Sequence, residues 1–353
     1  MTDPIQTDRR VFDRNLFRRD EVPPEKEGLP SVRQAIRQGM AEEMRQDEDI
    51  IQLGEDIATA PPFGVTSGMA DEFGRDRVRN IPATEEAVVG AAVGAAIHDV
   101  RSVVEFQFGD FLSVAVDQLT HQAAMLRYLT GGQVSVPIVL RLPCGGGQST
   151  GPQHSQSLYS WFAHVPGIKV ALPSTPMDAK GLIKTAIRDE NPVCFFEHKS
   201  LYSLRMDVPD GYQDPDHTIP FGQAAIRRKG SDVTVVASLA MVHEALAAAE
   251  RLANEGIDVE VVDPRTLVPL DADTILESVG KTGRLVVVDE AYLPCGIQAE
   301  VVTRVVEDAF DDLTSPPQRL GNPGVPVPFA PNMEDAVLPD QEDIIEAIIA
   351  TVS

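Results

Sequence analysis

Short runs of apolar residues alternate with helix-like segments along most of this chain. The runs 136–140, 168–172 and 193–197 are apolar at most successive positions, so both faces of such strands are expected to be buried. Strands of this kind need helices on both sides of their sheet, and the intervening segments supply them. The pattern predicts an α/β protein whose sheet is mostly parallel.

The alternation occurs twice, with a polar stretch between the two halves that contains Pro209, Gly211 and Pro215. Two domains are therefore expected, which suits a chain of 353 residues. The predicted division is an N-terminal arm over 1–28, a first domain over 29–205, a linker over 206–219 and a smaller domain over 220–353. The helices expected are 32–44, 87–96, 112–129, 177–188, 242–255, 274–279 and 342–350. The remaining strands expected are 50–53, 78–81, 103–108, 233–238, 259–263 and 285–289. The proline-rich stretch 316–331 is expected to run over the surface.

Composition excludes several classes of partner. The net charge is −24, which disfavours binding to nucleic acid or to an anionic membrane surface. No apolar run approaches the roughly 18–20 residues that cross a bilayer, and the N-terminus is polar and charged without an apolar signal core. The three cysteines are far apart, which predicts neither a zinc site nor a disulfide framework. We expect a cytoplasmic protein.

Glu85 is the first candidate for chemistry. It follows Ile81-Pro82, which ends a predicted strand, and it opens a helix rich in alanine and glycine. The dipole of a helix stabilises a carboxylate at its N-terminus. On local evidence alone, an ordinary N-terminal charge is the favoured interpretation.

His154 is the second candidate. It lies in a polar loop of small residues, 151–156, at the head of the strand–helix–strand unit 168–197. Such loops carry chemistry in α/β proteins because the scaffold beneath them is rigid. A lone histidine in a polar loop is more often a hydrogen-bonding residue, so the loop by itself leaves both readings open. A glycine-rich G-x-G-x-x-G turn between strand and helix is absent, which leaves nicotinamide binding unsupported.

The block 151–202, which contains Gln153-His154-Ser155-Gln156, resembles the beta subunit of the thiamin-diphosphate-dependent dehydrogenase that opens the 2-oxo acid dehydrogenase complexes. Further matching blocks include 196–199 (FEHK) and 262–271 (VDPRTLVPLD), and the resemblance runs from Leu29 to the C-terminus. It implies two doubly wound α/β domains. A thiamin pyrimidine-binding transketolase-like domain comes first, and a smaller transketolase C-terminal-like domain follows.

The resemblance also implies roles for individual residues. Glu85 would bond a ring nitrogen of the aminopyrimidine of thiamin diphosphate and promote loss of the thiazolium proton. Phe111 would lie against the pyrimidine with Gln107 nearby. His154 would stabilise reaction intermediates and help to orient the incoming lipoyl group, work that suits an imidazole.

A potassium site is implied as well. The family's ligands fall on Ile138, Ala186, Ile187, Asp189 and Asn191, and oxygen ligands of this kind suit a hard monovalent cation. On the residues alone, an ordinary turn at the end of a helix is the favoured alternative.

The chain lacks the Gly-Asp-Gly stretch and following asparagine that hold magnesium and diphosphate in thiamin enzymes. The resemblance therefore implies an alpha subunit that holds the magnesium, in an alpha-two, beta-two heterotetramer, and a lipoyl-bearing acyltransferase core. Acidic residues at 307–308 and 311–312 are candidate contacts for that core. Pyruvate or a branched-chain 2-oxo acid is the expected substrate. The alternatives left open are an acetoin dehydrogenase beta subunit and a non-catalytic scaffolding subunit.

Overall fold

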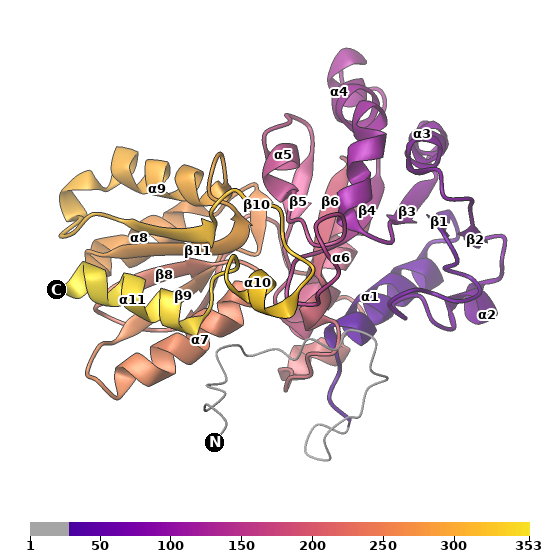
Figure 1. The fold of residues 1–353 in the computed structure, drawn as a ribbon. Helices are drawn as coiled ribbons and strands as arrows, with labels where there is room; N and C mark the ends of the chain where they lie inside the picture. Colours follow the sequence, from indigo (N-terminus) through magenta and orange to yellow (C-terminus); the bar gives the residue numbers. More distant parts are fainter. Residues whose placement is uncertain (1–27) are drawn as a thin grey trace, which may run out of the picture.

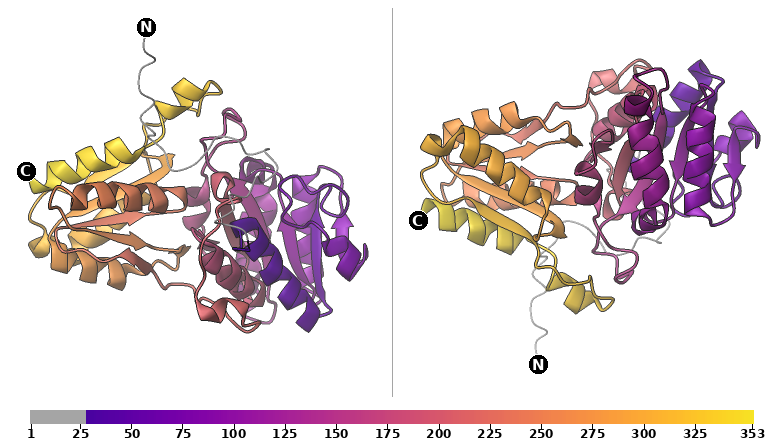
Figure 2. Two further views of the ribbon diagram at one scale, coloured as in Figure 1. Left: turned by 90° about the horizontal axis from the view of Figure 1, so that it is seen from below. Right: turned by 90° about the horizontal axis from the view of Figure 1, so that it is seen from above.

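The computed structural model describes residues 28–353, so the predicted arm over 1–28 lies outside the described residues except for Gly28. The chain forms two lobes that lie side by side (Figure 1), and the views from below and above show the same arrangement (Figure 2). Each lobe is a sheet covered by helices on both faces, as the sequence predicts.

The first lobe is built on a seven-stranded sheet of order β10-β5-β6-β4-β3-β1-β2. All neighbouring strands are parallel except β10, which comes from the second half of the chain and pairs antiparallel with β5. The strands are β1 (Ile50–Gly54), β2 (Val78–Asn80), β3 (Arg101–Glu105), β4 (Ile138–Cys144), β5 (Lys169–Ala171), β6 (Val193–His198) and β10 (Thr266–Val268).

Helices cover both faces of this sheet. Figure 1 shows α1 and α6 below it and α3, α4 and α5 above. Ser31 caps the N-terminus of α1: its hydroxyl accepts from the amide of Gln34, whose side chain accepts from the amide of Ser31. The helices are α1 (Val32–Gln46), α2 (Met69–Phe73), α3 (Glu85–Ala96), α4 (Ala124–Leu129), α5 (Tyr159–Ala163) and α6 (Pro176–Arg188).

The single helix predicted over 112–129 is wrong in its geometry. A 3₁₀ helix spans Gly109–Ala115, a π-helical segment spans Gln118–Ala123, and only Ala124–Leu129 is α-helical. In a π segment each hydrogen bond joins residues five positions apart instead of four, and such segments occur frequently at functional sites. Apolar spacing identified the inward face here but could not reveal the change of helix type.

The second lobe is a five-stranded sheet of order β12-β11-β8-β9-β7, parallel except for the edge strand β7. In Figure 1, α7 and α11 lie below the sheet and α8 and α9 above it. Its strands are β7 (Ala225–Arg228), β8 (Val233–Ala237), β9 (Val259–Asp263), β11 (Leu285–Tyr292) and β12 (Gln318–Asn322). Its helices are α7 (Ala240–Ala253), α8 (Ala272–Thr282), α9 (Ile297–Asp308), α10 (Pro331–Asp335) and α11 (Gln341–Val352).

The proline-rich stretch 316–331 does not simply run over the surface, because β12 lies within it and pairs with β11. Strands β7, β10 and β12 and helix α9 were not expected. The three strands have three to five residues each and carry polar side chains, so no apolar run marks them. Neighbouring strands supply the pairing that the local sequence does not specify.

The two lobes share their apolar cores. Buried residues form two clusters, and each cluster contains residues of both lobes. One cluster joins Ile183 of α6 to Ile344 of α11, and the other joins Phe162 of α5 to Val301 of α9. No helix in the part of the chain that the structure describes is long and apolar enough to cross a membrane.

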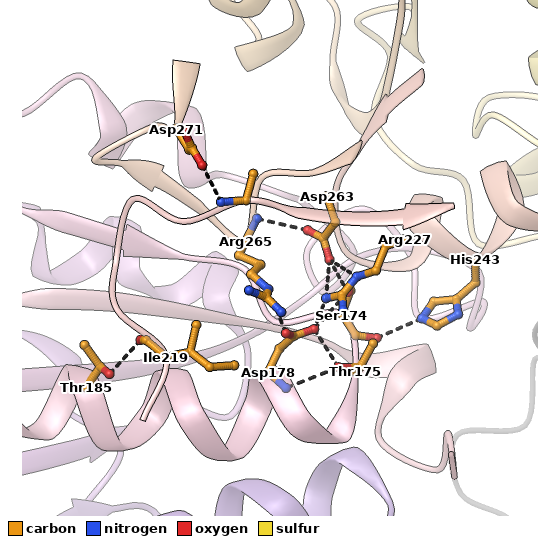
Figure 3. A network of polar contacts seen from close by, with 11 residues as sticks. Ser174, Thr175, Asp178, Thr185, Ile219, Arg227, His243, Asp263, Arg265 and Asp271 are labelled. Atoms are coloured by element: carbon orange, nitrogen blue, oxygen red, sulfur yellow. Dashed lines mark hydrogen bonds and ion pairs between the residues drawn. The ribbon is translucent and has the colours of Figure 1, made fainter. Parts of the chain in front are cut away.

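A buried ion network also joins the lobes (Figure 3). Arg227 of β7 forms ion pairs with Asp178 of α6 and with Asp263, at 2.8 Å for the second pair. Arg265 forms a further pair with Asp178 at 2.8 Å. His243 of α7 donates to the carbonyl of Ser174 at 2.8 Å, and its burial lowers the pKa of its imidazole. Because Asp178 and Asp263 are fully buried, these two arginines are needed to neutralise them.

Candidate active site

The candidate site lies at the carboxyl ends of three adjacent strands, β3, β4 and β6. The segment 106–111 follows β3, the loop 145–156 follows β4, and Lys199 follows β6. Strands β3 and β6 are the two neighbours of β4, and all three run parallel. Their carboxyl ends therefore meet at one edge of the sheet, which is where open α/β sheets bind ligands.

His154 lies in an aromatic cluster at this edge. The ring centroid of His154 is 4.5 Å from that of Phe108 and 5.7 Å from that of Phe111, and both contacts are edge-to-face. Phe63 extends the cluster, at 5.6 Å from Phe108. The half-buried imidazole is thus held by flat apolar surfaces, in a geometry that aromatic pairs favour. His154 and Phe111, two of the residues predicted from the sequence, meet here.

Lys199 fixes the main chain of the histidine loop. Its ammonium is buried and donates to the carbonyls of Gly145 and His154, at 2.5 Å each. It also lies 5.7 Å from the ring centroid of Phe108. Burial lowers the pKa of this ammonium, while the neighbouring anionic groups oppose the shift. One buried cation therefore joins both ends of the loop and lies over the ring of Phe108, which contacts His154.

Asp110 is a buried carboxyl beside the cluster. Its Oδ1 atom accepts from the amide of Gln156 at 3.2 Å and from the side-chain amide at 3.1 Å. Its Oδ2 atom has no hydrogen-bond partner among the described residues. Burial raises the pKa of this carboxyl, which the bonds from Gln156 only partly counteract. A buried oxygen of this kind is suited to receive a hydrogen bond from a bound group.

Glu290, at the end of β11, reaches the same edge from the second lobe. Its Oε2 atom is 2.9 Å from Nε2 of His198, and its Oε1 atom accepts from the amide of Gly146 and the hydroxyl of Ser157, at 3.0 Å each. Burial raises the pKa of this carboxyl, but the charge of His198 and these donors outweigh burial and hold the pKa at about 2. Next to it, Asp289 accepts from the hydroxyl of Tyr159, and burial raises its pKa to about 6.

Glu85 is the first residue of α3, as predicted, and it is half-buried. Helix α3 packs against the 3₁₀ helix Gly109–Ala115, which carries Phe111, and against β3. Gln107 follows β3 and is half-buried as well. The structure therefore places Glu85 and Gln107 on elements that adjoin the aromatic cluster, and it records no direct contact between either residue and His154.

The predicted potassium ligands gather at the opposite edge of the sheet. Ile138 begins β4, whereas the histidine loop follows its last residue, about 20 Å away at roughly 3.3 Å per residue. The carbonyls of Ile187 and Asp189 accept from the guanidinium of Arg101, at 3.0 and 3.2 Å. The carboxylate of Asp189 accepts from Lys169 and from both nitrogens of Asn191.

Sequence reasoning missed the buried charged residues around the loop. Lys199 lies in the matching block 196–199. A lysine that directly follows an apolar strand could have been identified as a candidate for a buried charge at the end of that strand. Glu290 likewise follows the apolar run 285–288. Nothing local distinguishes Glu334, a buried residue of α10 that accepts from the loop amides of Gly147 and Ser149.

Comparisons with known proteins agree with this architecture. Residues 29–205 match the transketolase pyrimidine-binding domain, and residues 222–344 match the transketolase C-terminal domain. A solved structure described as a split-gene transketolase, an inactive beta4 tetramer, superimposes with a TM-score of 0.74 at 21% identity, covering 92% of this chain and 99% of its own. That structure supports the fold only.

Relatives of higher identity specify the family. The beta subunit of acetoin:2,6-dichlorophenolindophenol oxidoreductase from Cupriavidus necator is 45% identical, over 91% of this chain and 97% of its own length. The beta subunit of the pyruvate dehydrogenase E1 component from Rhizobium meliloti is 43% identical, over 91% and 69%. The beta subunit of 2-oxoisovalerate dehydrogenase from Bacillus subtilis is 44% identical, over 85% and 91%.

The fold and the two matching domains define a transketolase-like protein. More particularly, the chain belongs to the family of dehydrogenase beta subunits that includes the pyruvate, acetoin and branched-chain members. The fold class and the family resemblance inferred from the sequence are thereby confirmed.

The depressed pKa of Glu290 predicts a pH-dependent contribution to stability. Because the folded-state pKa of about 2 lies below the ordinary value of 4.5, the ionised carboxylate stabilises the fold above pH 4.5. The contribution, of about 3 kcal/mol at most, is lost as the pH falls from 4.5 towards 2. We expect Glu290→Gln to lower the unfolding midpoint at pH 7 and to differ less from the wild type near pH 3. Circular dichroism melts at both pH values measure this, and an equal deficit at the two values would contradict it.

Proposed function

We propose that this chain is the beta subunit of a 2-oxo acid dehydrogenase component. With an alpha subunit it would bind thiamin diphosphate, decarboxylate pyruvate or a branched-chain 2-oxo acid, and reductively acylate the lipoyl group of an acyltransferase core. The observation that carries the proposal is the placement of His154 in ring contact with Phe111, at the carboxyl edge of a domain that matches the pyrimidine-binding family.

The residues at this edge fit the pyrimidine half of the cofactor. Phe111 offers a flat apolar face, Gln107 offers an amide, and Glu85 offers a half-buried carboxylate at the start of a helix. The unpartnered Oδ2 atom of Asp110 marks buried polar space in the same region. Thiamin diphosphate, when bound, supplies the electron sink that decarboxylation of a 2-oxo acid requires. The chain's part is to hold the ring and to share a proton through Glu85.

His154 is the second residue to which we assign a role. Its ring is oriented by Phe108 and Phe111, and its carbonyl is held by Lys199 and by the hydroxyl of Thr150 at 3.1 Å. A histidine positioned in this way can stabilise charge or exchange a proton near neutral pH. We assign it to the intermediates and to the orientation of the incoming lipoyl group.

The diphosphate half of the cofactor, with its magnesium, belongs in our proposal to an alpha subunit. The relatives are named as beta subunits, and this supports assembly with an alpha partner. The assembly that we propose is an alpha-two, beta-two heterotetramer, and the location that we propose is the cytoplasm. The cofactor would then lie between the two kinds of chain, so neither chain alone would be active.

A Glu85→Gln exchange tests the assignment. The variant keeps the size of the side chain but cannot share the proton, so we expect turnover to fall by about 100-fold or more. The assay measures reduction of an artificial electron acceptor by the complex of both subunits, with thiamin diphosphate and magnesium. Pyruvate, branched-chain 2-oxo acids and acetoin are compared, because the relative at 45% identity is named for acetoin.

The neighbouring residue provides a matched control. Glu86 is exposed on the same turn of α3, so Glu86→Gln should keep most of the activity of the parent. Equal losses in the two variants would remove Glu85 from the mechanism. A stable complex that binds the cofactor but turns over none of the substrates would favour the scaffolding alternative.

We further propose that the turn after α6 binds potassium. A carbonyl oxygen has two lone pairs, so Ile187 and Asp189 can each contact a cation while still accepting from Arg101. The carbonyl of Ala186 accepts from the amide of Asp189, and Asn191 donates to the carboxylate of Asp189. Val136, two positions before Ile138, donates its amide to the carbonyl of Glu190 in the same turn. Binding to the folded state would raise the unfolding midpoint in potassium chloride above that in choline chloride of the same ionic strength. Equal midpoints in the two salts would contradict the site.

Docking of the acyltransferase core is proposed for the end of α9. Glu307, Asp308, Asp311 and Asp312 are exposed there, around the 66% exposed Phe310. An acidic surface with an apolar centre fits a basic binding module. Because exposed charges are screened by salt, we expect the association rate with the core to fall as ionic strength rises. Stopped-flow or surface-binding measurements test this, and a rate independent of salt would exclude the acidic surface.

A further inference from the structure

The segment 329–338 leaves the second lobe and packs on the loop that precedes His154. It lies between β12 and α11 and contains the short helix α10, seen in gold near the boundary of the two lobes in Figure 1. Its contacts fall on the loop 146–151, which lies nearly 190 positions earlier in the sequence, since Gly147 and Glu334 are 187 positions apart.

Glu334 makes the principal contact. Its Oε1 atom accepts from the amide of Gly147 at 2.8 Å, and its Oε2 atom accepts from the amide of Ser149 at 2.9 Å. The hydroxyl of Ser149 lies 3.2 Å from the same Oε2 atom. Both loop residues have positive φ angles, of 81° and 54°. This backbone turns two amides towards one anion, as in the nests that bind anionic groups.

Apolar contacts flank this carboxylate on both sides. A Cβ atom at Gly146 would come within 2.5 Å of Leu338, and one at Gly151 would come within 3.4 Å of Phe329. Glycine at 146 therefore permits a close approach that a larger residue would prevent. The side chain of Glu334 is itself fully buried, so leaving its carboxylate without the bonds from the loop amides would be costly.

The rest of the loop is held by other buried ions. Lys199 binds the carbonyls of Gly145 and His154, and Glu290 accepts from the amide of Gly146. Glu334 thus holds the middle of the loop, between the two points that Lys199 fixes. Of these three groups, the two carboxylates come from the second lobe.

We propose that Glu334 is a positioning residue for His154. It would act by holding Gly147 and Ser149 in the left-handed conformation that aims the following residues at the aromatic cluster. The second lobe would then set the geometry of the catalytic loop as well as pack beside the first lobe. The role of Glu334 in catalysis rests on the proposed function. The bonds from the amides of Gly147 and Ser149 to Glu334, which we call the clamp, do not depend on it.

Glu334→Gln tests the clamp in the isolated chain. The amide keeps one acceptor oxygen and replaces the other with a donor, so one of the two bonds to the amides of Gly147 and Ser149 is lost. We expect hydrogen exchange in the peptide spanning 145–156 to rise by about tenfold, because the loss of one charge-assisted bond is worth about that factor. Glu346→Gln, on the exposed face of α11, is the control and should leave this peptide unchanged. Unchanged exchange in the Glu334 variant would overturn the clamp.

A second measurement separates positioning from simple stabilisation. In the complex with the alpha subunit, turnover per site loaded with thiamin diphosphate should fall by about tenfold or more, since small misplacements of a catalytic group are costly. The KM for the 2-oxo acid should stay within about twofold, because no substrate contact is removed. A merely structural role would reduce the number of loaded sites and leave turnover per loaded site unchanged, and that result would overturn the proposal.

A milder variant covers the case in which Glu334→Gln fails to fold. Phe329 is 70% exposed, so Phe329→Ala should fold normally while removing the contact over Gly151. We expect a smaller rise in exchange, confined to the same peptide. If the wild-type complex turns over none of the substrates, the proposed function fails, whereas the exchange results still decide whether the clamp exists.

Discussion

One buried arginine joins the three strands on which the site depends. Arg141 of β4 forms ion pairs with Glu105 of β3 and with Glu197 of β6, the latter at 2.7 Å, and all three side chains are almost completely buried. Tyr202 donates to Glu197 at 2.7 Å, and burial raises the pKa of Glu105 while the charge of Arg141 opposes that shift. Removing one member of such a group leaves an uncompensated buried charge, which typically costs about 3–5 kcal/mol. The relative placement of the three strand ends therefore follows from this contact.

Buried charged groups with satisfied bonds are also found where the two lobes meet. Asp178 of the first lobe pairs with Arg227 of the second lobe and with Arg265, and the loop after β4 is held by Glu290 and Glu334 of the second lobe. Each contact places a charge in a region of low dielectric, where a satisfied bond is strong and an unsatisfied group is costly. The loop that carries His154 is consequently held by residues of both lobes, and the second lobe contributes directly to the candidate site.

The sequence predicted most of the regular structure because apolar periodicity marks it. The expected strand at 193–197 and the expected helix at 177–188 agree with β6 and α6 to within one residue at each end. Failures occurred where tertiary contacts decide: the π segment before α4, the short polar strand β10, and β12 within a proline-rich stretch. Helix type and the pairing of edge strands are set by neighbours that are distant in sequence.

The residues of the candidate site were likewise only partly predictable from the sequence. Phe111 and His154 could be named from local motifs, and the structure brings them into contact. The groups that hold them are separated from the loop by 45 to 187 positions, so no local pattern could reveal their contacts with the loop.

The most direct test is calorimetric titration of thiamin diphosphate, with magnesium, into the beta chain, into the alpha chain and into the assembled complex. We predict saturable, high-affinity binding in the complex. Binding to the beta chain alone should be at least about 100-fold weaker, because this chain lacks the contacts to the diphosphate and magnesium that we assign to the alpha subunit. Binding to the beta chain alone with the affinity of the complex would contradict a site shared between subunits.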